Sequence, residues 1–322
     1  MSRVQVFFTV DVEIWPGSWT DIDGRFPEAF QRYIYGPTPF GPHGLPLKLQ
    51  VLRDHGLKGV FFVEPVFSAR FGLAPLQEVV GLIQEGGQEV QLHVHAEWLD
   101  EARVPIVARP PAGKVQHLSL LSLEHQTELI GWSQRRLHEA GAVRSNAFRA
   151  GSFMFNRDTL RALEANGLAI DSSYNHYFHG PASGIVDASL IPILPFRVGN
   201  VLEVPVTVYR DLPFNLRPVQ LKGCSLAEMK SVLHKAADAG HSTVVIVSHS
   251  FELLDRRDYS RDETVVQRFT GLCEFLAQNR DRFETRGFAD TQCEPVTRQP
   301  IPVTGNTLGL GVRYMEQVKR RL

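Results

Sequence analysis

Two short runs of the sequence concentrate carboxylates and imidazoles. The first reads T-V-D-V-E and ends at Glu13, so Asp11 and Glu13 lie two residues apart and face the same side of an extended chain. The second reads L-H-V-H-A-E and places His93, His95 and Glu97 within five residues. Imidazoles and carboxylates together are ligands for a divalent cation.

Three further segments that look like strands end in groups able to do chemistry. Arg149 stands in F-R-A-G-S-F, Asp171 opens D-S-S-Y, and His249 lies in S-H-S directly after the apolar run 244–247. Taken alone, each has an ordinary interpretation as a turn residue, a salt-bridge partner or a structural histidine. Together with the two runs above, they stand at the ends of five predicted strands, where α/β proteins place their active sites.

Hydrolysis of an amide requires a polarised carbonyl, an activated water and an acid for the leaving nitrogen. A divalent cation held by imidazoles and carboxylates supplies the first two. A carboxylate base and a histidine acid complete the set. The sequence offers all of these groups, and it therefore predicts a catalytic site.

Strand-like and helical patterns alternate along most of the chain. The predicted strands are residues 4–10, 59–63, 89–92, 147–149, 169–171, 204–209 and 244–247. The predicted helices are residues 45–55, 76–84, 123–140, 156–167, a segment that starts at a capping box at 225–228, and 263–278. This order predicts an α/β fold, a distorted or partial (β/α) barrel of about seven parallel strands. We expect one catalytic domain over 1–322, with its core at 4–290 and an extension at 291–322.

Two long connections interrupt the alternation, at residues 15–44 and 100–119. Long irregular loops in compact domains are often functional, and both follow strands that end in candidate site residues. Trp15, Trp98 and Tyr174 lie close to the candidate residues in the sequence and could stack on sugar rings, although packing of the loops explains them equally well.

Composition narrows the functional classes. The formal net charge is −1, without the excess of basic residues that is typical of nucleic-acid-binding proteins. The three cysteines are widely spaced, so neither a disulfide framework nor a thiolate zinc site is indicated. No apolar run is long enough to span a bilayer. The N-terminus runs directly into the first predicted strand instead of a signal peptide, and we expect a cytoplasmic protein.

The five runs resemble the motifs of the polysaccharide deacetylase (NodB-homology) family, over residues 4 to 290. T-V-D-V-E looks like a variant of the first motif of the family, T-F-D-D-G. In the family, the aspartate that matches Asp11 is the catalytic base, and the metal-binding aspartate that follows it is replaced here by Val12. Glu13, the nearest acid on the same face, is our candidate for the missing ligand.

The second motif of the family is H-S/T-x-x-H, and its two histidines bind the metal. His93 matches the first of them, but Glu97 stands where the second is expected and His95 is an additional imidazole. The resemblance therefore leaves open whether His93 is joined by Glu97 or by His95. The candidate metal ligands are Glu13, His93, His95 and Glu97, and zinc is the expected cation.

The remaining motifs imply roles for three residues. Arg149 matches the arginine that orients the catalytic base, and Asp171 matches the aspartate that tunes the catalytic histidine. His249 matches that histidine, which acts as the general acid. An aspartate hydrogen-bonded to an imidazole would raise its pKa and fix its tautomer.

The resemblance implies a metal-dependent hydrolase that removes an N-acyl group, acetyl in the first instance, from an amino sugar in a small molecule or a glycan. Two alternatives stay open. One is an allantoinase-like hydrolase that acts on a non-sugar C–N bond. The other is a carbohydrate-binding protein that has lost catalysis.

Overall fold

The computed structural model describes residues 3–187, 189–212, 215–291 and 293–320. The strands are β1 (Val4–Val12), β2 (Pro37–Thr38), β3 (Gly41–Pro42), β4 (Gly59–Val63), β5 (Glu89–Val94), β6 (Ala147–Ala150), β7 (Ile170–Asp171), β8 (Phe196–Val198), β9 (Val201–Glu203), β10 (Val208–Leu212), β11 (Asn215–Pro218), β12 (Thr243–His249) and β13 (Phe283–Thr285). The helices are α1 (Ile22–Phe30), α2 (Leu45–Asp54), α3 (Ser68–Phe71), α4 (Ala74–Glu85), α5 (Leu123–Glu139), α6 (Arg157–Ala165), α7 (Leu226–Asp238), α8 (Glu263–Gln278) and α9 (Thr307–Lys319).

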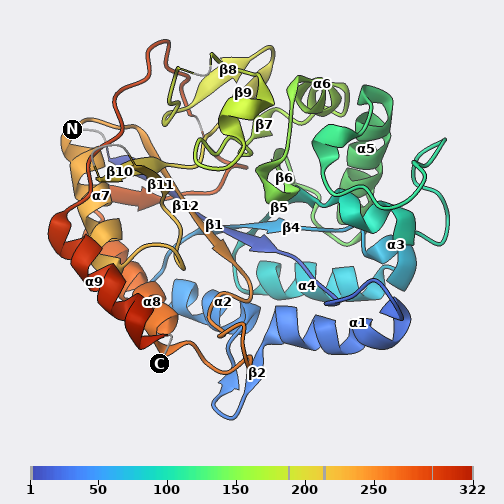
Figure 1. Ribbon diagram of the computed structural model, residues 1–322, viewed down its shortest axis with the longest axis horizontal. Coiled ribbons are helices and arrows are strands. Elements are labelled where there is room, and N and C mark those ends of the chain that lie inside the picture. Colours follow the sequence, from blue (N-terminus) through green and yellow to red (C-terminus); the bar gives the residue numbers. More distant parts are fainter. Residues whose placement is uncertain (1–2, 188, 213–214, 292, 321–322) are drawn as a thin grey trace.

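One curled sheet organises the molecule (Figure 1). Its main path runs β12-β1-β4-β5-β6-β7-β9, and neighbouring strands along this path are parallel. Among the described residues, that path has seven strands; β8 adds an antiparallel edge, and β13 pairs with the start of β1. The predicted distorted or partial (β/α) barrel of about seven parallel strands is confirmed.

Alternation along β1 sends its side chains to two different cores. Val6, Phe8 and Val10 pack toward the outer helices, whereas Phe7 belongs to a second cluster with residues of β4, β9 and β12. Because the side-chain period of a strand is two, Asp11 lies on the same side as Phe7. The inner face of the sheet is thus apolar in the first part of β1 and acidic at the carboxyl end of that strand.

The barrel is closed by irregular chain rather than by a regular strand pair. Residues 204–207, which the sequence places in a strand, follow β9 without a regular ladder. The backbone N–H of Thr207 donates to Val245 of β12, and that of Leu221 donates to Val247. The strand prediction for 204–207 is therefore wrong, because this segment crosses from the β7–β9 edge to β12 instead of extending one ladder.

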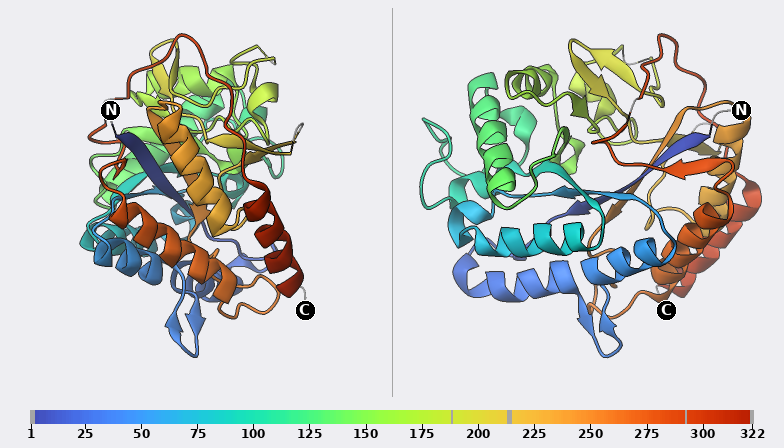
Figure 2. Two further views of the ribbon diagram at one scale, coloured as in Figure 1. Left: turned by 90° about the vertical axis from the view of Figure 1, so that its left-hand side faces the viewer. Right: turned by 180° about the vertical axis from the view of Figure 1, so that it is seen from behind.

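Helices cover the outside of the sheet (Figures 1 and 2). The predicted helices correspond to α2, α4, α5, α6, α7 and α8, and the ends agree within about two residues. Capping explains two of the starts, since Asn156 and Ser225 each form a capping box with the residue three positions later.

Residues 15–44 are not the irregular loop that their prolines and glycines predict. They contain α1, a π-helical turn (Gln31–Tyr35) and the hairpin β2–β3. Phe26 of α1 stacks on Phe71 of α3 with ring centroids 3.7 Å apart. This apolar anchoring overrides the local glycine and proline signals, and it holds the segment beside the upper end of the barrel.

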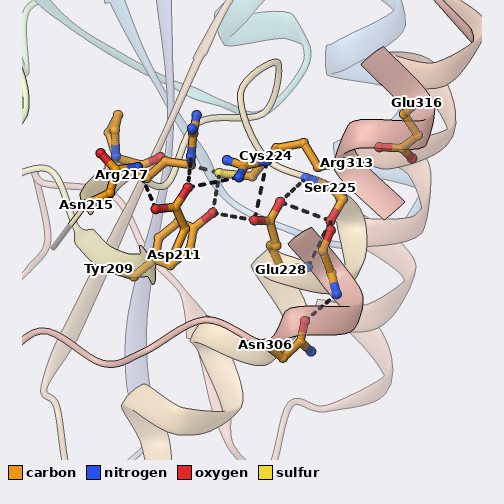
Figure 3. Close-up of polar contacts among 12 residues, drawn as sticks. Tyr209, Asp211, Asn215, Arg217, Cys224, Ser225, Glu228, Asn306, Arg313 and Glu316 are labelled. Carbon is orange, nitrogen blue, oxygen red and sulfur yellow. Dashed lines mark hydrogen bonds and ion pairs between the residues drawn. The ribbon is translucent and has the colours of Figure 1, made fainter. Parts of the chain in front are cut away.

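The C-terminal extension ends in α9, a helix that was not predicted from the sequence. Arg313, which is 1% exposed, lies between two buried acids, with its Nη2 2.9 Å from Asp211 Oδ2 and its Nε 3.6 Å from Glu228 Oε1 (Figure 3). Glu316 of α9 forms a second ion pair with Arg268 of α8. These contacts fix α9 against α7 and α8.

Within the part of the chain that the structure describes, none of the helices has both the length and the apolar character needed to cross a bilayer.

Candidate active site

Strand register brings the predicted residues together at the carboxyl ends of β1, β5, β6 and β12. Asp11 lies opposite His249 in the β1–β12 pair, and His93 lies opposite Arg149 in the β5–β6 pair. The parallel sheet places these ends at a common edge, where α/β folds bind ligands.

A cavity of about 480 Å³ opens at this edge. Its walls combine charged and aromatic side chains: Asp11, Glu13, Trp15, Trp19, Tyr33, His93, His95, Phe153, His249, Phe251 and Arg256. Its volume lies within the ~300–1,000 Å³ range of small-molecule sites.

Glu13, His93 and His95 form a cluster whose potential ligand atoms lie within 4.8 Å of one another. The Nε2 atom of His95 lies 3.3 Å from one oxygen of Glu13, and that of His93 lies 4.0 Å from the other. All three side chains are buried, and among the described residues the Nε2 atoms of His93 and His95 have no hydrogen-bond partner. Two buried nitrogens directed at a carboxylate match the donor set of a divalent cation.

The outer ring atoms of both histidines are held by the protein. His93 Nδ1 lies 2.8 Å from the carbonyl oxygen of Arg149, and His95 Nδ1 lies 3.2 Å from Glu97 Oε2. Outer partners of this kind fix the orientation of metal-binding imidazoles. Glu97 therefore stands behind His95, and the prediction that Glu97 is itself a ligand does not fit the geometry.

The charges in the cluster are tightly linked. Burial lowers the pKa of His93 to about 4. Burial also opposes the charge on His95, but the carboxylate of Glu13 outweighs it and raises the pKa of His95 to about 10. The nearby imidazoles lower the pKa of Glu13 well below its usual range despite its burial. A divalent cation would replace the proton on His95, because metal binding to histidine releases protons.

Asp11 is held by a buried arginine. Arg149 Nη1 donates to Asp11 Oδ1 at 2.7 Å and to Thr9 Oγ1 at 2.8 Å. The remaining guanidinium nitrogens donate to the carbonyl and hydroxyl oxygens of Ser172. Arg149 is fully buried, so it holds the Asp11 carboxylate in one orientation.

His249 has a different carboxylate partner from the one predicted. Its Nδ1 lies 2.9 Å from Glu252 Oε1, and its Nε2 lies 3.4 Å from Glu13 Oε1. Burial would lower the pKa of His249, but the hydrogen bond and the charge of Glu252, together with the charges of Glu13 and Asp11, outweigh burial and raise the pKa to about 9. The predicted contact between Asp171 and His249 is wrong, because Glu252, three residues after His249, occupies that position.

Asp171 pairs instead with another acid. It lies opposite Glu203 in the β7–β9 pair, and the two buried carboxyl groups influence each other's pKa. Burial raises the pKa of both groups. Among the described residues, one oxygen of each carboxyl group has no other partner, and a proton shared between them satisfies both. Asp171 also accepts a hydrogen bond from the hydroxyl of Ser173, so its described neighbours are Ser173 and the facing Glu203 rather than His249.

Of the three predicted sugar-binding aromatics, Trp15 lines the cavity. Trp98 is 1% exposed and packs edge-on against Trp19, while Tyr174 is fully buried against Phe196. The prediction for Trp98 and Tyr174 is therefore wrong, because their rings lie in the core where no substrate can reach them.

Several cavity residues were missed from the sequence: Tyr33, Phe153, Phe251 and Arg256. Ser152 and Phe153 adopt left-handed φ angles of 53° and 58°. Such backbone costs non-glycine residues ~1–3 kcal/mol and is concentrated at functional sites. Glu64, which follows β4, is a buried acid whose carboxylate accepts from the backbone N–H groups of Val66 and Phe67; burial raises its pKa to about 8, against the charge of His95.

The chain matches no protein-family model and no curated protein sequence. Its fold is similar to that of a Mycobacterium smegmatis protein assigned as a polysaccharide deacetylase, with 17% identity over 93% of this chain and 95% of the other, at a TM-score of 0.55. A 4-alpha-glucanotransferase from Thermococcus litoralis gives a TM-score of 0.53, with 12% identity over 99% of this chain and 47% of the other. A family 4 carbohydrate esterase from Streptomyces lividans gives 0.43, with 12% identity over 94% and 97% of the two chains.

At these identities the first two likenesses show a shared fold and leave the reaction open. The fold expected from the resemblance to polysaccharide deacetylases is therefore confirmed.

Proposed function

We propose that this chain belongs to the polysaccharide deacetylases and is a metal-dependent hydrolase that removes an acetyl group from an amino sugar. One observation supports this most directly. Asp11, held by an arginine, and His249, held by a carboxylate, both border the cavity that contains the Glu13–His93–His95 cluster. A base, an acid and a cation site are the groups that amide hydrolysis requires.

Glu13, His93 and His95 are the proposed metal ligands. One carboxylate and two imidazoles suit Zn²⁺, and the Nε2 atoms of His93 and His95, which lack a hydrogen-bond partner among the described residues, support this assignment. When bound, a divalent cation polarises the acyl carbonyl and lowers the pKa of the attacking water. The oxygen of Glu97 and the carbonyl of Arg149 keep the two rings turned toward the site.

Asp11 is the proposed base. Its carboxylate is fixed by Arg149 at the wall of the cavity, so it can accept a proton from the attacking water without reorienting. Holding a reacting group in place in advance lowers the entropic part of the activation barrier of the reaction.

His249 is the proposed acid. Its Nε2 lies on the cavity side, 3.4 Å from Glu13 Oε1, and the carboxylate of Glu252, 2.9 Å from Nδ1, stabilises the protonated ring. It can therefore donate a proton to the nitrogen that leaves when the C–N bond breaks. A positioned acid contributes typically ~10²–10⁴-fold to the rate.

The walls of the cavity favour a sugar over a small polar amide. Trp15, Trp19 and Phe153 present aromatic surface beside the polar cluster, a combination that suits the apolar faces of sugar rings. An allantoinase-like activity uses the same base and acid, and substrate tests separate the two. The structural likeness to a glucanotransferase suggests a different reaction, glycosyl transfer with Asp11 and Glu13 as the two carboxylates. The imidazoles beside Glu13 favour a cation-assisted reaction instead.

The test is acetate release from N-acetylated glycans by the protein loaded with Zn²⁺ or Co²⁺ and by the chelated protein. We expect release that requires the metal and that is lost in Asp11→Asn and His249→Ala. His125→Ala, on α5 outside the cavity, is the matched control and should keep full activity. Hydrolysis of allantoin alone would select the second activity, and no amide hydrolysis by the loaded protein would contradict the proposal in favour of a binding protein.

A further inference from the structure

A buried chain of polar groups runs behind His249 toward α2. Lys48 Nζ donates to Ser248 Oγ at 2.8 Å, and Ser248 Oγ donates to Glu252 Oε2 at 3.1 Å. The other oxygen of Glu252 lies 2.9 Å from His249 Nδ1. A lysine from one helix is thus connected, through a serine and a glutamate, to the imidazole at the cavity.

Lys48 is an unusual residue for its place in the fold. Its side chain is fully buried and its Nζ lies 4.7 Å from the centre of the Phe269 ring. Burial lowers the pKa of Lys48 to about 8, although the charge of Glu252 works against that shift. Burying an ammonium group is costly unless it is paired. A methionine would fill the same space without that cost, so packing alone does not explain the charge.

The charge of Lys48 acts on Glu252, through Ser248. The carboxylate is 2% exposed, and each of its oxygens has a donor: Gln220 and His249 at Oε1, and Ser248 at Oε2. Because Ser248 uses its only proton on Glu252, it can accept from Lys48 without competition. The arrangement prevents the carboxylate from rotating, and it leaves a single direction for the hydrogen bond to His249.

We propose that Glu252, fixed by Lys48 through Ser248, is the positioning residue that orients His249 and directs its Nε2 into the cavity. Neither Glu252 nor Lys48 touches the reacting atoms, and both act through the imidazole. The role in catalysis rests on the proposed function, while the control of the imidazole by Glu252 is independent of it.

The kinetic test uses Glu252→Gln and Lys48→Met, with Lys58→Met as a matched lysine control at the opposite end of the barrel. We expect Glu252→Gln to lower kcat roughly 10- to 100-fold with little change in KM, because orientation of an acid matters mainly in the transition state. Lys48→Met should lower kcat by a smaller factor. The double variant should be no slower than Glu252→Gln, because residues acting through one partner are not additive. In a His249→Ala background, Glu252→Gln should have no further effect.

A second readout does not need activity. In protein labelled with ¹⁵N-histidine, the resonance of the His249 Nδ1–H group should move in Glu252→Gln and, less, in Lys48→Met, and should stay in place in Lys58→Met. Unchanged kcat and an unchanged resonance in folded Glu252→Gln would overturn the proposal; if that variant does not fold, Lys48→Met decides in the same way. If no amide is hydrolysed but the resonance moves, the proposed function fails and the control of His249 by Glu252 stands.

Discussion

Gly151 sets the space available to His95, and its replacement by alanine tests the metal site without touching a ligand. A Cβ atom at this position would lie 2.5 Å from Nδ1 of His95 and 2.7 Å from Cε1 and Cγ of the same ring. Ordinary contacts between such atoms are ~3.5 Å, so the imidazole has to move by about 1 Å. Gly151 does not have a left-handed φ, and alanine therefore adds no backbone strain of its own.

The displaced ring would lose its alignment with Glu13 on one side and with Glu97 on the other. Loss of a group that orients a metal-binding histidine typically costs 10- to 100-fold in affinity. We therefore expect Gly151→Ala to bind Zn²⁺ about 10- to 100-fold more weakly than the wild type. The affinity is measured by competition with a chromophoric chelator.

Gly81→Ala is the matched control, since no atom of the described residues, apart from its chain neighbours and the backbone of its own helix, lies within 4 Å of a Cβ atom at that position of α4. It should keep wild-type zinc affinity and gain up to ~1 kcal/mol in stability from its helix propensity. In a His95→Ala background, Gly151→Ala should have no further effect on zinc. Wild-type affinity in a folded Gly151→Ala variant would refute the assignment of His95 as a ligand.

Three further substitutions test other parts of the account. His249→Ala should lower kcat by ~10²–10⁴-fold with little change in KM, as measured by steady-state acetate release; full turnover would remove His249 from the mechanism. Arg313→Met should lower the free energy of unfolding by about 2 kcal/mol, because it removes one charged partner of the buried Asp211, which keeps Arg217; an unchanged free energy of unfolding in urea would contradict a stabilising role for Arg313. Burial raises the pKa of Glu203 in the folded state, so the folded protein binds more protons than the unfolded chain above pH ~4.5 and loses stability as the pH rises. Glu203→Gln leaves Asp171 as the only acid of the pair. The free energy of unfolding of this variant, minus that of the wild type, should be larger at pH 8 than at pH 5. An equal difference at both pH values would contradict a raised pKa of Glu203 in the folded state.

The parts of the site that local periodicity determines were predictable from the sequence. Asp11 and Glu13 share a face because they are two residues apart on one strand, and the same holds for His93 and His95. Parallel strands of an α/β barrel bring their carboxyl ends together, which is why Asp11 and His249 meet. The fold class followed from the same alternation.

Contacts made by loops were not predictable in this way. The partner of His249 is Glu252, which a turn after β12 folds back onto the ring, although the spacing of three residues in H-S-F-E was visible in the sequence. Trp98 stands beside a candidate ligand in the sequence, yet its ring packs among aromatic side chains of other segments. Proximity along the chain does not specify which way a side chain faces once the strand has ended.

The proposed reaction depends on a divalent cation held by Glu13, His93 and His95 beside Asp11 and His249. Anomalous diffraction at the zinc absorption edge from crystals of the zinc-loaded protein tests it most directly. We predict one strong peak in contact with Glu13, His93 and His95, and its loss in His95→Ala. A peak that contacts Glu97 in place of His95, or zinc bound only outside this cavity, would contradict the account.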